Sequence, residues 1–161
     1  MLHGKNARPV LPSPAPASCR PANLGALLGA VRGELVHAIE ARIAAKGLEL
    51  RFTQFLIVER LSRLGPMRAS ELAHAVDVDC GAMTRQLDQL EHRGYLRRCP
   101  HELDRRALRI ELTADGKALW KQLAGCGEHV LATAQAPLAA DERKHLLDYL
   151  QRMLQVLRPD L

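Results

Sequence analysis

The chain has 161 residues, of which 47% are hydrophobic and 25% charged, and its formal net charge is +5. This length fits one domain with appendages, and the apolar share is large enough to bury a core. The aromatic residues are one Trp, two Tyr and two Phe, so the core must be largely aliphatic, which favours packed helices over a sandwich of sheets. No apolar run approaches the roughly 20 residues that span a bilayer, and the N-terminus has no apolar segment of the secretory type. We therefore expect a mainly helical, cytoplasmic protein without membrane contact.

Residues 1–21 are basic and rich in proline. They contain five of the nine prolines together with Lys5, Arg8 and Arg20, and no acidic residue. This composition predicts a flexible arm rather than a packed element. The arm either has no role of its own, or reaches a partner subunit or DNA phosphates, and the sequence leaves both alternatives open.

Two amphipathic helices are predicted after the arm. From Asn23 to near Gly47, apolar residues recur at steps of three and four, which predicts a helix of about six turns. A second apolar pattern predicts a helix over 53–64, with Thr53 as its N-cap. This helix should stop at Gly65-Pro66, because proline cannot continue a helix.

A short helix and a longer one are predicted next, over Ser70–Val76 and Cys80–Arg93, and Gly94 should end the longer one. The apolar side of the longer helix consists of Met83, Leu87 and Leu90. Two short strands with a polar connection follow, over 95–99 and 108–112. The apolar positions of the second strand alternate at Leu108, Ile110 and Leu112. We therefore expect a hairpin with one buried face.

Two further helices are predicted towards the C-terminus. Thr113 to Gly116 should cap a long fifth helix that runs until Pro137 interrupts the pattern. Its apolar stripe consists of Leu119, Leu123, Cys126 and Val130. A sixth helix carries apolar residues at coiled-coil spacing, namely Leu146, Leu150, Met153, Leu154 and Leu157.

The order of short helix, tight turn, second helix and hairpin is that of a winged helix-turn-helix, whose second helix enters the DNA major groove. The predicted second helix begins with small residues, Gly81 and Ala82, which permit close approach to a duplex. Thr84, Arg85 and Gln89 share a face roughly opposite the apolar side and can bond base edges and phosphates. An ordinary amphipathic helix with a solvated polar face is the alternative.

The hairpin region is the strongest local cationic cluster. Its six arginines are Arg93, Arg97, Arg98, Arg105, Arg106 and Arg109. Arginine at a hairpin tip can enter a narrow, A·T-rich minor groove, while Arg97 or Arg98 would lie where the strand meets phosphate. A solvated charged loop is the alternative reading of the same cluster.

Four stretches carry a family resemblance: Val78–Leu90, Arg93–Arg98, Asp104–Arg106 and Leu112–Gly116. They resemble the recognition helix, the strand entry, the wing motif Asp-x-Arg and the exit motif Leu-Thr-x-x-Gly of the MarR (multiple antibiotic resistance regulator) family. The likeness runs from about Leu24 to Leu157 and leaves out only the proline-rich arm.

The resemblance implies a mainly α fold with a winged helix-turn-helix and a β-hairpin wing, in which the N- and C-terminal helices form a dimerisation domain. We accordingly divide the chain into the arm (1–21), a helical dimerisation region (22–48 and 114–161) and the DNA-binding module (49–113). The implied function is that of a homodimeric transcriptional regulator, in most cases a repressor, on a palindromic double-stranded operator.

The resemblance also assigns roles to individual residues. Asp104 would support the wing, Arg106 would contact DNA or pair with Asp79, and Thr84 and Arg85 would read or position the major groove. The full set of predicted DNA-binding residues is Ser70, Asp79, Gly81, Ala82, Thr84, Arg85, Gln89, Arg97, Arg98, Asp104, Arg105 and Arg106.

Two kinds of signal are implied by the family. A small phenolic or aromatic effector would bind between the dimerisation helices and the winged module, where His37, Arg51 and Trp120 are candidate lining residues, although each is also an ordinary surface or packing residue. Alternatively, oxidation would link Cys19 and Cys126.

Cys80 is a separate candidate for oxidation. A helix N-terminus lowers the pKa of a thiol, and the DNA surface would lie beside it. The alternative for Cys80 is a small buried packing thiol.

Other classes of function find less support. The chain has no glycine-rich phosphate loop, nucleophile elbow or metal-binding His/Glu pair, so we expect neither an enzyme nor a cofactor. The four cysteines form no CxxC pair, and we expect no metal site. A winged-helix protein-interaction module without specific DNA binding is the alternative of a different class.

Overall fold

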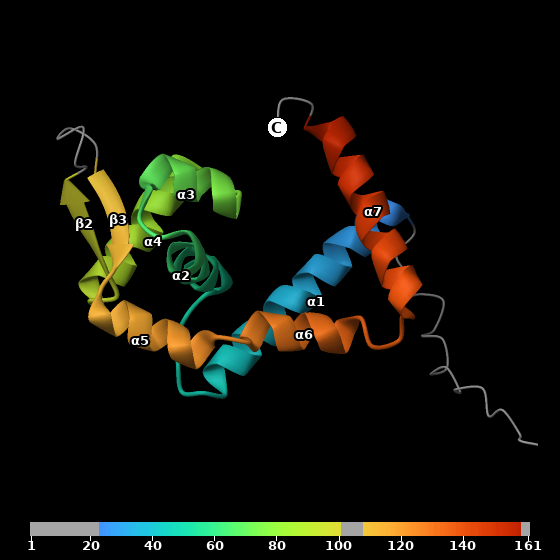
Figure 1. The fold of residues 1–161 in the computed structure, drawn as a ribbon, viewed down its shortest axis with the longest axis horizontal. Coiled ribbons are helices and arrows are strands. Elements are labelled where there is room, and N and C mark those ends of the chain that lie inside the picture. The colour runs from blue at the N-terminus through green and yellow to red at the C-terminus, as the bar shows by residue number, and fades with distance from the viewer. Residues whose placement is uncertain (1–22, 101–107, 159–161) are drawn as a thin grey trace, which may run out of the picture. The chain divides into compact units, whose positions relative to one another are not determined.

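The computed structural model describes residues 23–100 and 108–158. In chain order its elements are α1 (Leu24–Ala44), α2 (Phe52–Leu64), β1 (Met67–Arg68), α3 (Ala69–Val76), α4 (Cys80–His92), β2 (Leu96–Pro100), β3 (Leu108–Leu112), α5 (Ala114–Leu123), α6 (Cys126–Ala134) and α7 (Ala140–Leu157). The predicted mainly α, winged helix-turn-helix fold is confirmed (Figure 1). The chain divides between Gly33 and Glu34, so the beginning of α1 belongs to a different compact unit from the remainder.

The three strands form one antiparallel sheet in the order β1-β3-β2. The hairpin pairs Leu96 with Leu112 and Pro100 with Leu108, close to the predicted bounds. Strand β1, which pairs Met67 with Ile110, was not predicted, because two residues are too few to show an alternating pattern.

The core lies where α2 packs against α3, α4, α5 and β3. Its fully buried side chains are aliphatic or sulfur-containing, as the composition predicts. The largest are Ile43, Ile57, Leu72, Met83, Leu87, Leu90, Leu96, Ile110 and Leu123. Together they hold the helix-turn-helix and the base of the wing in one packed unit.

The predicted N-cap of the second helix is wrong by two residues. Helix α2 begins at Phe52, and Arg51 rather than Thr53 takes the extended N-cap conformation. The Gln54 side chain accepts a hydrogen bond from the Arg51 N–H at 3.2 Å, so the backbone donor of the N-cap residue is paired with the side chain three positions later.

The predicted long fifth helix is two helices. Helix α5 ends at Leu123, and α6 starts at Cys126 after an extended Ala124 and a left-handed Gly125 with φ 79°. Glycine adopts this conformation without a steric penalty, so it allows the break. Cys126 and Val130 are nevertheless buried with Leu119 and Leu123, so the predicted apolar stripe continues across the break.

The hairpin buries two of its three predicted apolar positions. Ile110 and Leu112 are buried, whereas Leu108 is 50% exposed. Leu108 pairs with Pro100 at the outer end of the hairpin, beyond the helices that cover the inner end. The expectation that Leu108 is buried was therefore wrong.

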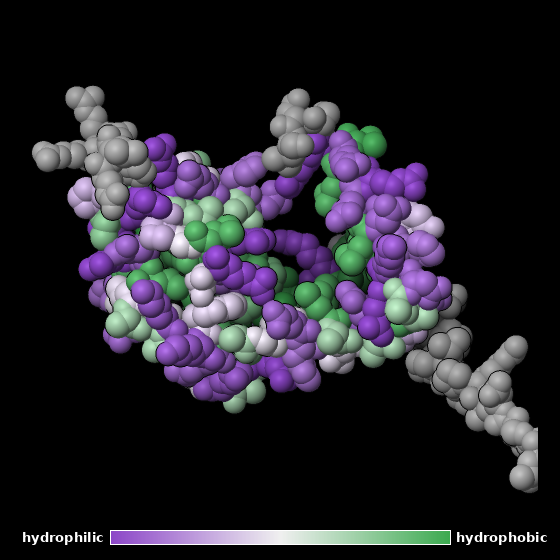
Figure 2. Space-filling model, viewed as in Figure 1, coloured by the Kyte–Doolittle hydropathy of each residue, from purple (hydrophilic) through white to green (hydrophobic). Residues whose placement is uncertain are grey.

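Helix α7 carries apolar side chains that no other described part of the chain buries. None of its residues, all of which the structure describes, is buried. Leu147 and Leu154 are more than half exposed, and Figure 2 shows hydrophobic surface along α7. The beginning of α1 likewise exposes Leu24, Leu27, Leu28 and Val31. No helix within the described ranges is long and apolar enough to cross a membrane.

Candidate nucleic-acid interface

The turn between α3 and α4 sets the start of the predicted recognition helix. Asp77 ends α3 in the left-handed conformation, with φ 59°, and its N–H bonds to the His74 carbonyl. Asp79 then caps α4, because its Oδ1 accepts a hydrogen bond from the Ala82 N–H at 2.7 Å. This bond, with smaller contributions from the Gly81 N–H and the Arg85 charge, lowers the pKa of the Asp79 carboxyl. Asp79 is therefore an ionised cap at the end where the helix dipole favours a negative charge.

Helix α4 separates an apolar from a polar side. Met83, Leu87 and Leu90 are buried, as predicted. Gly81, Thr84 and Arg85 are exposed on the first two turns, and Ala82 is half-buried beside them. The Thr84 hydroxyl donates to the Cys80 carbonyl at 2.9 Å and keeps an oxygen free to accept. These four predicted residues thus lie together at one end of the helix.

Gln89 and Ser70 have different settings. The Gln89 Oε1 accepts a hydrogen bond at 2.8 Å from Nε2 of the buried Gln54 on α2. Gln89, an exposed residue one turn after Arg85, therefore has its side chain bonded to α2. Ser70 is exposed in the first turn of α3, the helix that packs against α4.

The two arginines of β2 point in different directions. Arg97 pairs with Glu111 across the hairpin, and its side chain remains 66% exposed. This hydrogen bond, followed by one from the Cys99 thiol, lowers the pKa of the Glu111 carboxyl. Arg98 is 27% exposed and binds two carboxylates of α4, Asp88 at 2.6 Å and Glu91. Arg98 therefore ties β2 to α4, a structural role that its place in a cationic cluster did not reveal.

The tip of the wing lies outside the described residues. Asp104, Arg105 and Arg106 belong to this part, so their roles stay predictions. Of the remaining arginines in the cluster, Arg93 donates to the Glu49 carbonyl at 2.6 Å and Arg109 to the Pro66 carbonyl at 2.8 Å. Backbone contacts of this kind have no signal in the local sequence.

The exit motif after the hairpin is a packing device. The Thr113 hydroxyl donates to the Gly94 carbonyl at 2.6 Å and accepts from the Gly116 N–H at 3.1 Å, which confirms Thr113 as the cap of α5. A Cβ at Gly116 would lie 1.9 Å from the Tyr95 carbonyl oxygen. Glycine is therefore required there, and the motif fixes α5 against the end of α4.

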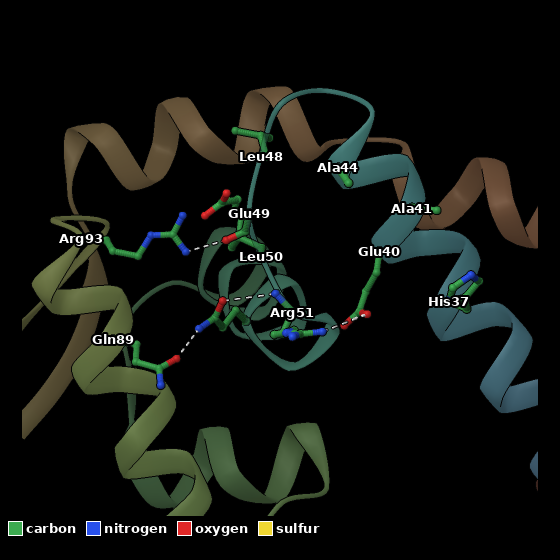
Figure 3. Close-up of a pocket in the computed structure, with 11 residues that line it drawn as sticks. His37, Glu40, Ala41, Ala44, Leu48, Glu49, Leu50, Arg51, Gln89 and Arg93 are labelled. Atoms are coloured by element: carbon green, nitrogen blue, oxygen red, sulfur yellow. Dashed lines mark hydrogen bonds and ion pairs between the residues drawn. The ribbon is translucent and has the colours of Figure 1, made fainter.

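A pocket of about 600 Å³ opens beside the C-terminal half of α4. Two of its predicted lining residues, His37 and Arg51, are present, together with Glu40, Gln54, Gln89 and Arg93 (Figure 3). Trp120 does not line this pocket. It packs against Phe55, with ring centroids 6.3 Å apart.

The cysteines differ in access. Cys80 is exposed, so the interpretation of a buried packing thiol was wrong, whereas Cys126 is buried. Cys99 lies between them in exposure, and its burial, followed by a hydrogen bond to Glu111, raises the pKa of its thiol. Cys19 lies outside the described residues. Within the described ranges, no group of three His, Cys, Asp or Glu side chains could hold a metal ion.

The region that contains this surface is similar in sequence to known proteins. A sequence model described as the MarR family matches residues 50–108. The chain is 36% identical over 75 residues to the multiple antibiotic resistance protein MarR of Salmonella typhimurium, covering 47% of this chain and 52% of that protein. It is 34% identical over 110 residues to the HTH-type transcriptional regulator PecS of Dickeya dadantii, covering 65% of each. The matches thus span about half the length of that MarR protein and somewhat more of PecS.

Solved structures extend the similarity to the whole fold. Wild-type MarR from E. coli in its apo form superimposes with a TM-score of 0.67 at 27% identity, covering 82% of this chain and 97% of that one. A mutant MarR from E. coli complexed with operator DNA gives a TM-score of 0.74 at 27% identity, covering 81% and 93%. The chain is thus similar in sequence to the MarR family over residues 50–108 and shares the fold of solved MarR structures.

Proposed function

We propose that the chain is a transcriptional regulator that binds double-stranded DNA sequence-specifically and acts as a repressor. The observation that carries the proposal is the division of α4, which exposes Gly81, Thr84 and Arg85 at its start while Met83 and Leu87 anchor its other side in the core. A helix held in this way can enter the major groove and present a hydroxyl and a guanidinium to bases and phosphates. The similarity to a MarR complexed with operator DNA supports this proposal.

The proposed regulator is a homodimer. Residues 22–48 and 114–161 would form the dimerisation region, because apolar side chains on α1 and α7 need a partner to cover them. Two modules, each over 49–113, would then meet a palindrome whose half-sites lie about 34–36 Å apart. Ser70, Arg97 and the wing residues Asp104, Arg105 and Arg106 complete the proposed contact set, with Arg98 as support. Residues 1–21 are proposed to be a flexible arm.

The proposed signal is a small aromatic or phenolic molecule that binds in the pocket lined by His37 and Arg51. The Arg51 side chain is 82% exposed and can receive a carboxylate or a phenolate. A panel of hydroxybenzoates titrated into the operator complex should include one that lowers affinity in the wild type and fails in Arg51→Ala. A panel without effect at saturating concentration would contradict this pocket.

The thiol-based alternative receives less support. Cys126 is 1% exposed, so an oxidant would reach it only after local opening of the fold. Cys80 is the accessible thiol and lies at the start of the recognition helix, where oxidation would interfere with DNA directly.

A protein-interaction module is the alternative of a different class. The proposed regulator is neither an enzyme nor dependent on a cofactor, and its target would place it in the cytoplasm. The exposed Thr84 and Arg85 favour DNA, because a hydroxyl and a guanidinium at the start of this helix can bond phosphates and base edges.

Selection from random duplexes tests the proposal. Purified protein should retain an inverted repeat with half-sites about one helical turn apart. The control is a variant with Arg85→Ala and Arg106→Ala, which should recover no repeat. If the wild-type protein enriches no sequence, and its weak binding vanishes at moderate salt, the interaction module is the better explanation.

A further inference from the structure

Gln54 is the one polar side chain in the buried set of the described residues, with 4% exposure. A buried amide destabilises a protein unless its polar atoms are paired. Both of its polar atoms are paired. Oε1 accepts from the Arg51 N–H at 3.2 Å, and Nε2 donates to Gln89 Oε1 at 2.8 Å.

The second of these bonds joins α2 to the recognition helix. Gln89 lies one turn before the end of α4, whose buried contacts are otherwise made by Met83, Leu87 and Leu90. Apolar side chains pack in several arrangements of similar free energy, whereas an amide-to-amide bond requires one distance and direction. The Gln54–Gln89 bond therefore restricts the position of α4 more narrowly than the buried apolar side chains of α4 do.

The same turn of α2 is bonded to α1. Glu40 Oε1 accepts a hydrogen bond from the Phe52 N–H at 2.8 Å, and its second oxygen lies 3.9 Å from the Arg51 guanidinium. Hydrogen bonds thus connect α1 with the first turn of α2, and that turn with α4. Glu40, Arg51, Gln54 and Gln89 also line the 600 Å³ pocket, so these bonds follow its wall (Figure 3).

We propose that Gln54 is a positioning residue, which holds α4 in its DNA-reading orientation through Gln89 and couples it to Glu40 on α1. The proposal rests on the proposed function in one respect, that α4 is the helix that reads DNA. A change at the corner between α1 and α2 that moves Arg51 or Glu40 would reach α4 through the Gln54 amide. Without the Gln54–Gln89 bond, α4 would occupy a wider range of orientations relative to α2. Only some of these orientations would fit the operator.

Two substitutions at position 54 test the role of the Gln54 amide. Leucine has a similar volume and suits a buried site, so Gln54→Leu should fold, although the loss of the bond to the Arg51 N–H should lower its urea midpoint somewhat. It cannot bond Gln89, and operator affinity should fall about fivefold or more. In Gln54→Glu, one carboxylate oxygen can still accept from the Arg51 N–H. The other can accept from the Gln89 NH2 group once the Gln89 amide flips, so operator affinity should return towards that of the wild type. Gln122→Leu, at an exposed glutamine of α5, is the matched control.

Two readouts on the full-length protein separate this proposal from the function on which it rests. In hydrogen exchange of the free protein, Gln54→Leu should speed exchange within α4 and leave α3 unchanged. In fluorescence anisotropy with the selected operator, the same variant should bind more weakly than the wild type and the control. Wild-type exchange and affinity in Gln54→Leu would overturn the proposal. A wild type that binds no duplex would overturn the function, while the exchange data would still decide the role of Gln54.

Discussion

The winged module and helix α7 differ in how far their apolar side chains are buried. In the module, each helix turns its apolar side towards another element of the same chain, and hydrogen bonds from Arg98 and Thr113 fasten the joints. In α7 the apolar residues lie in the open, with Leu147 and Leu154 exposed by 54% and 53%. The module thus buries its apolar sides together with the end of α1, α5 and α6, whereas the apolar side of α7 is left for a partner to cover.

The largest expected effect concerns α7. Leu147→Glu with Leu154→Glu places two carboxylates on its apolar side and should convert a dimer into a monomer, as sedimentation would show. Operator affinity should fall by about 10²–10⁴-fold, because two linked modules bind far better than one. Gln155→Glu, which adds one carboxylate to the polar side, is the control. A double variant that remains dimeric would show that the exposed apolar side of α7 does not form the dimer contact.

The rates at which the cysteines react with a thiol reagent should show that Cys126 of α6 is packed in the core. In a Cys19→Ser background, a thiol reagent should modify exposed Cys80 first. Cys99 should follow, because its raised pKa leaves less of the reactive thiolate. Cys126 should react at least ~100-fold more slowly than Cys80, because it requires local opening. Equal rates, measured by mass spectrometry over time, would mean that α6 is not stably packed.

The third prediction tests the joint between α5 and the end of α4. Gly116→Ala puts a methyl group 1.9 Å from the Tyr95 carbonyl oxygen, which backbone movement must relieve. We expect a loss of about 1–3 kcal/mol in the free energy of unfolding, measured with urea. Gly127→Ala is the control, since its nearest neighbour would be a Phe55 ring carbon at 3.4 Å. A Gly116→Ala protein as stable as the wild type would show that this joint is loose.

The sequence predicts elements best where periodicity is strong and both ends are marked. The helix that starts at Cys80 is found within one residue, because Asp79 caps it and its apolar positions repeat regularly. The break at Gly125 is missed because the apolar stripe continues through it in Cys126 and Val130, and one glycine within such a pattern does not indicate a helix end.

The candidate site is predictable in its exposed part only. Thr84 and Arg85 follow from helical geometry, since they lie opposite Met83 and Leu87. The partners of Arg98 and Gln89 do not, because Arg98 finds Asp88 and Gln89 finds Gln54 through the folding of distant segments together. Charge shows that arginines gather at the wing, and only the fold shows which of them are already bound.

The fourth prediction asks whether the exposed end of α4 acts in binding alone. Arg85→Ala should weaken operator binding by about 1–3 kcal/mol if the guanidinium bonds a base, and by less if it meets phosphate. Stability should remain unchanged, since Arg85 is exposed. Arg63→Ala removes the same charge from an exposed position on α2, where surface ion pairs contribute little, and is the control. Equal affinity of both variants would remove Arg85 from the site.

The smallest expected effect is the pH dependence of the cap on α4. The pKa of Asp79 is lowered in the folded chain, so its ionised form adds stability above the unfolded pKa of about 3.9, and this contribution disappears as the pH falls through the folded value. Asn caps a helix as well as Asp but carries no charge. The difference in unfolding free energy between wild type and Asp79→Asn, from urea titrations at several pH values, should therefore shrink below pH about 4. A difference that stays constant would mean that the cap acts through its hydrogen bond to Ala82 alone, and that the charge beside Arg85 contributes nothing to holding the exposed end of α4.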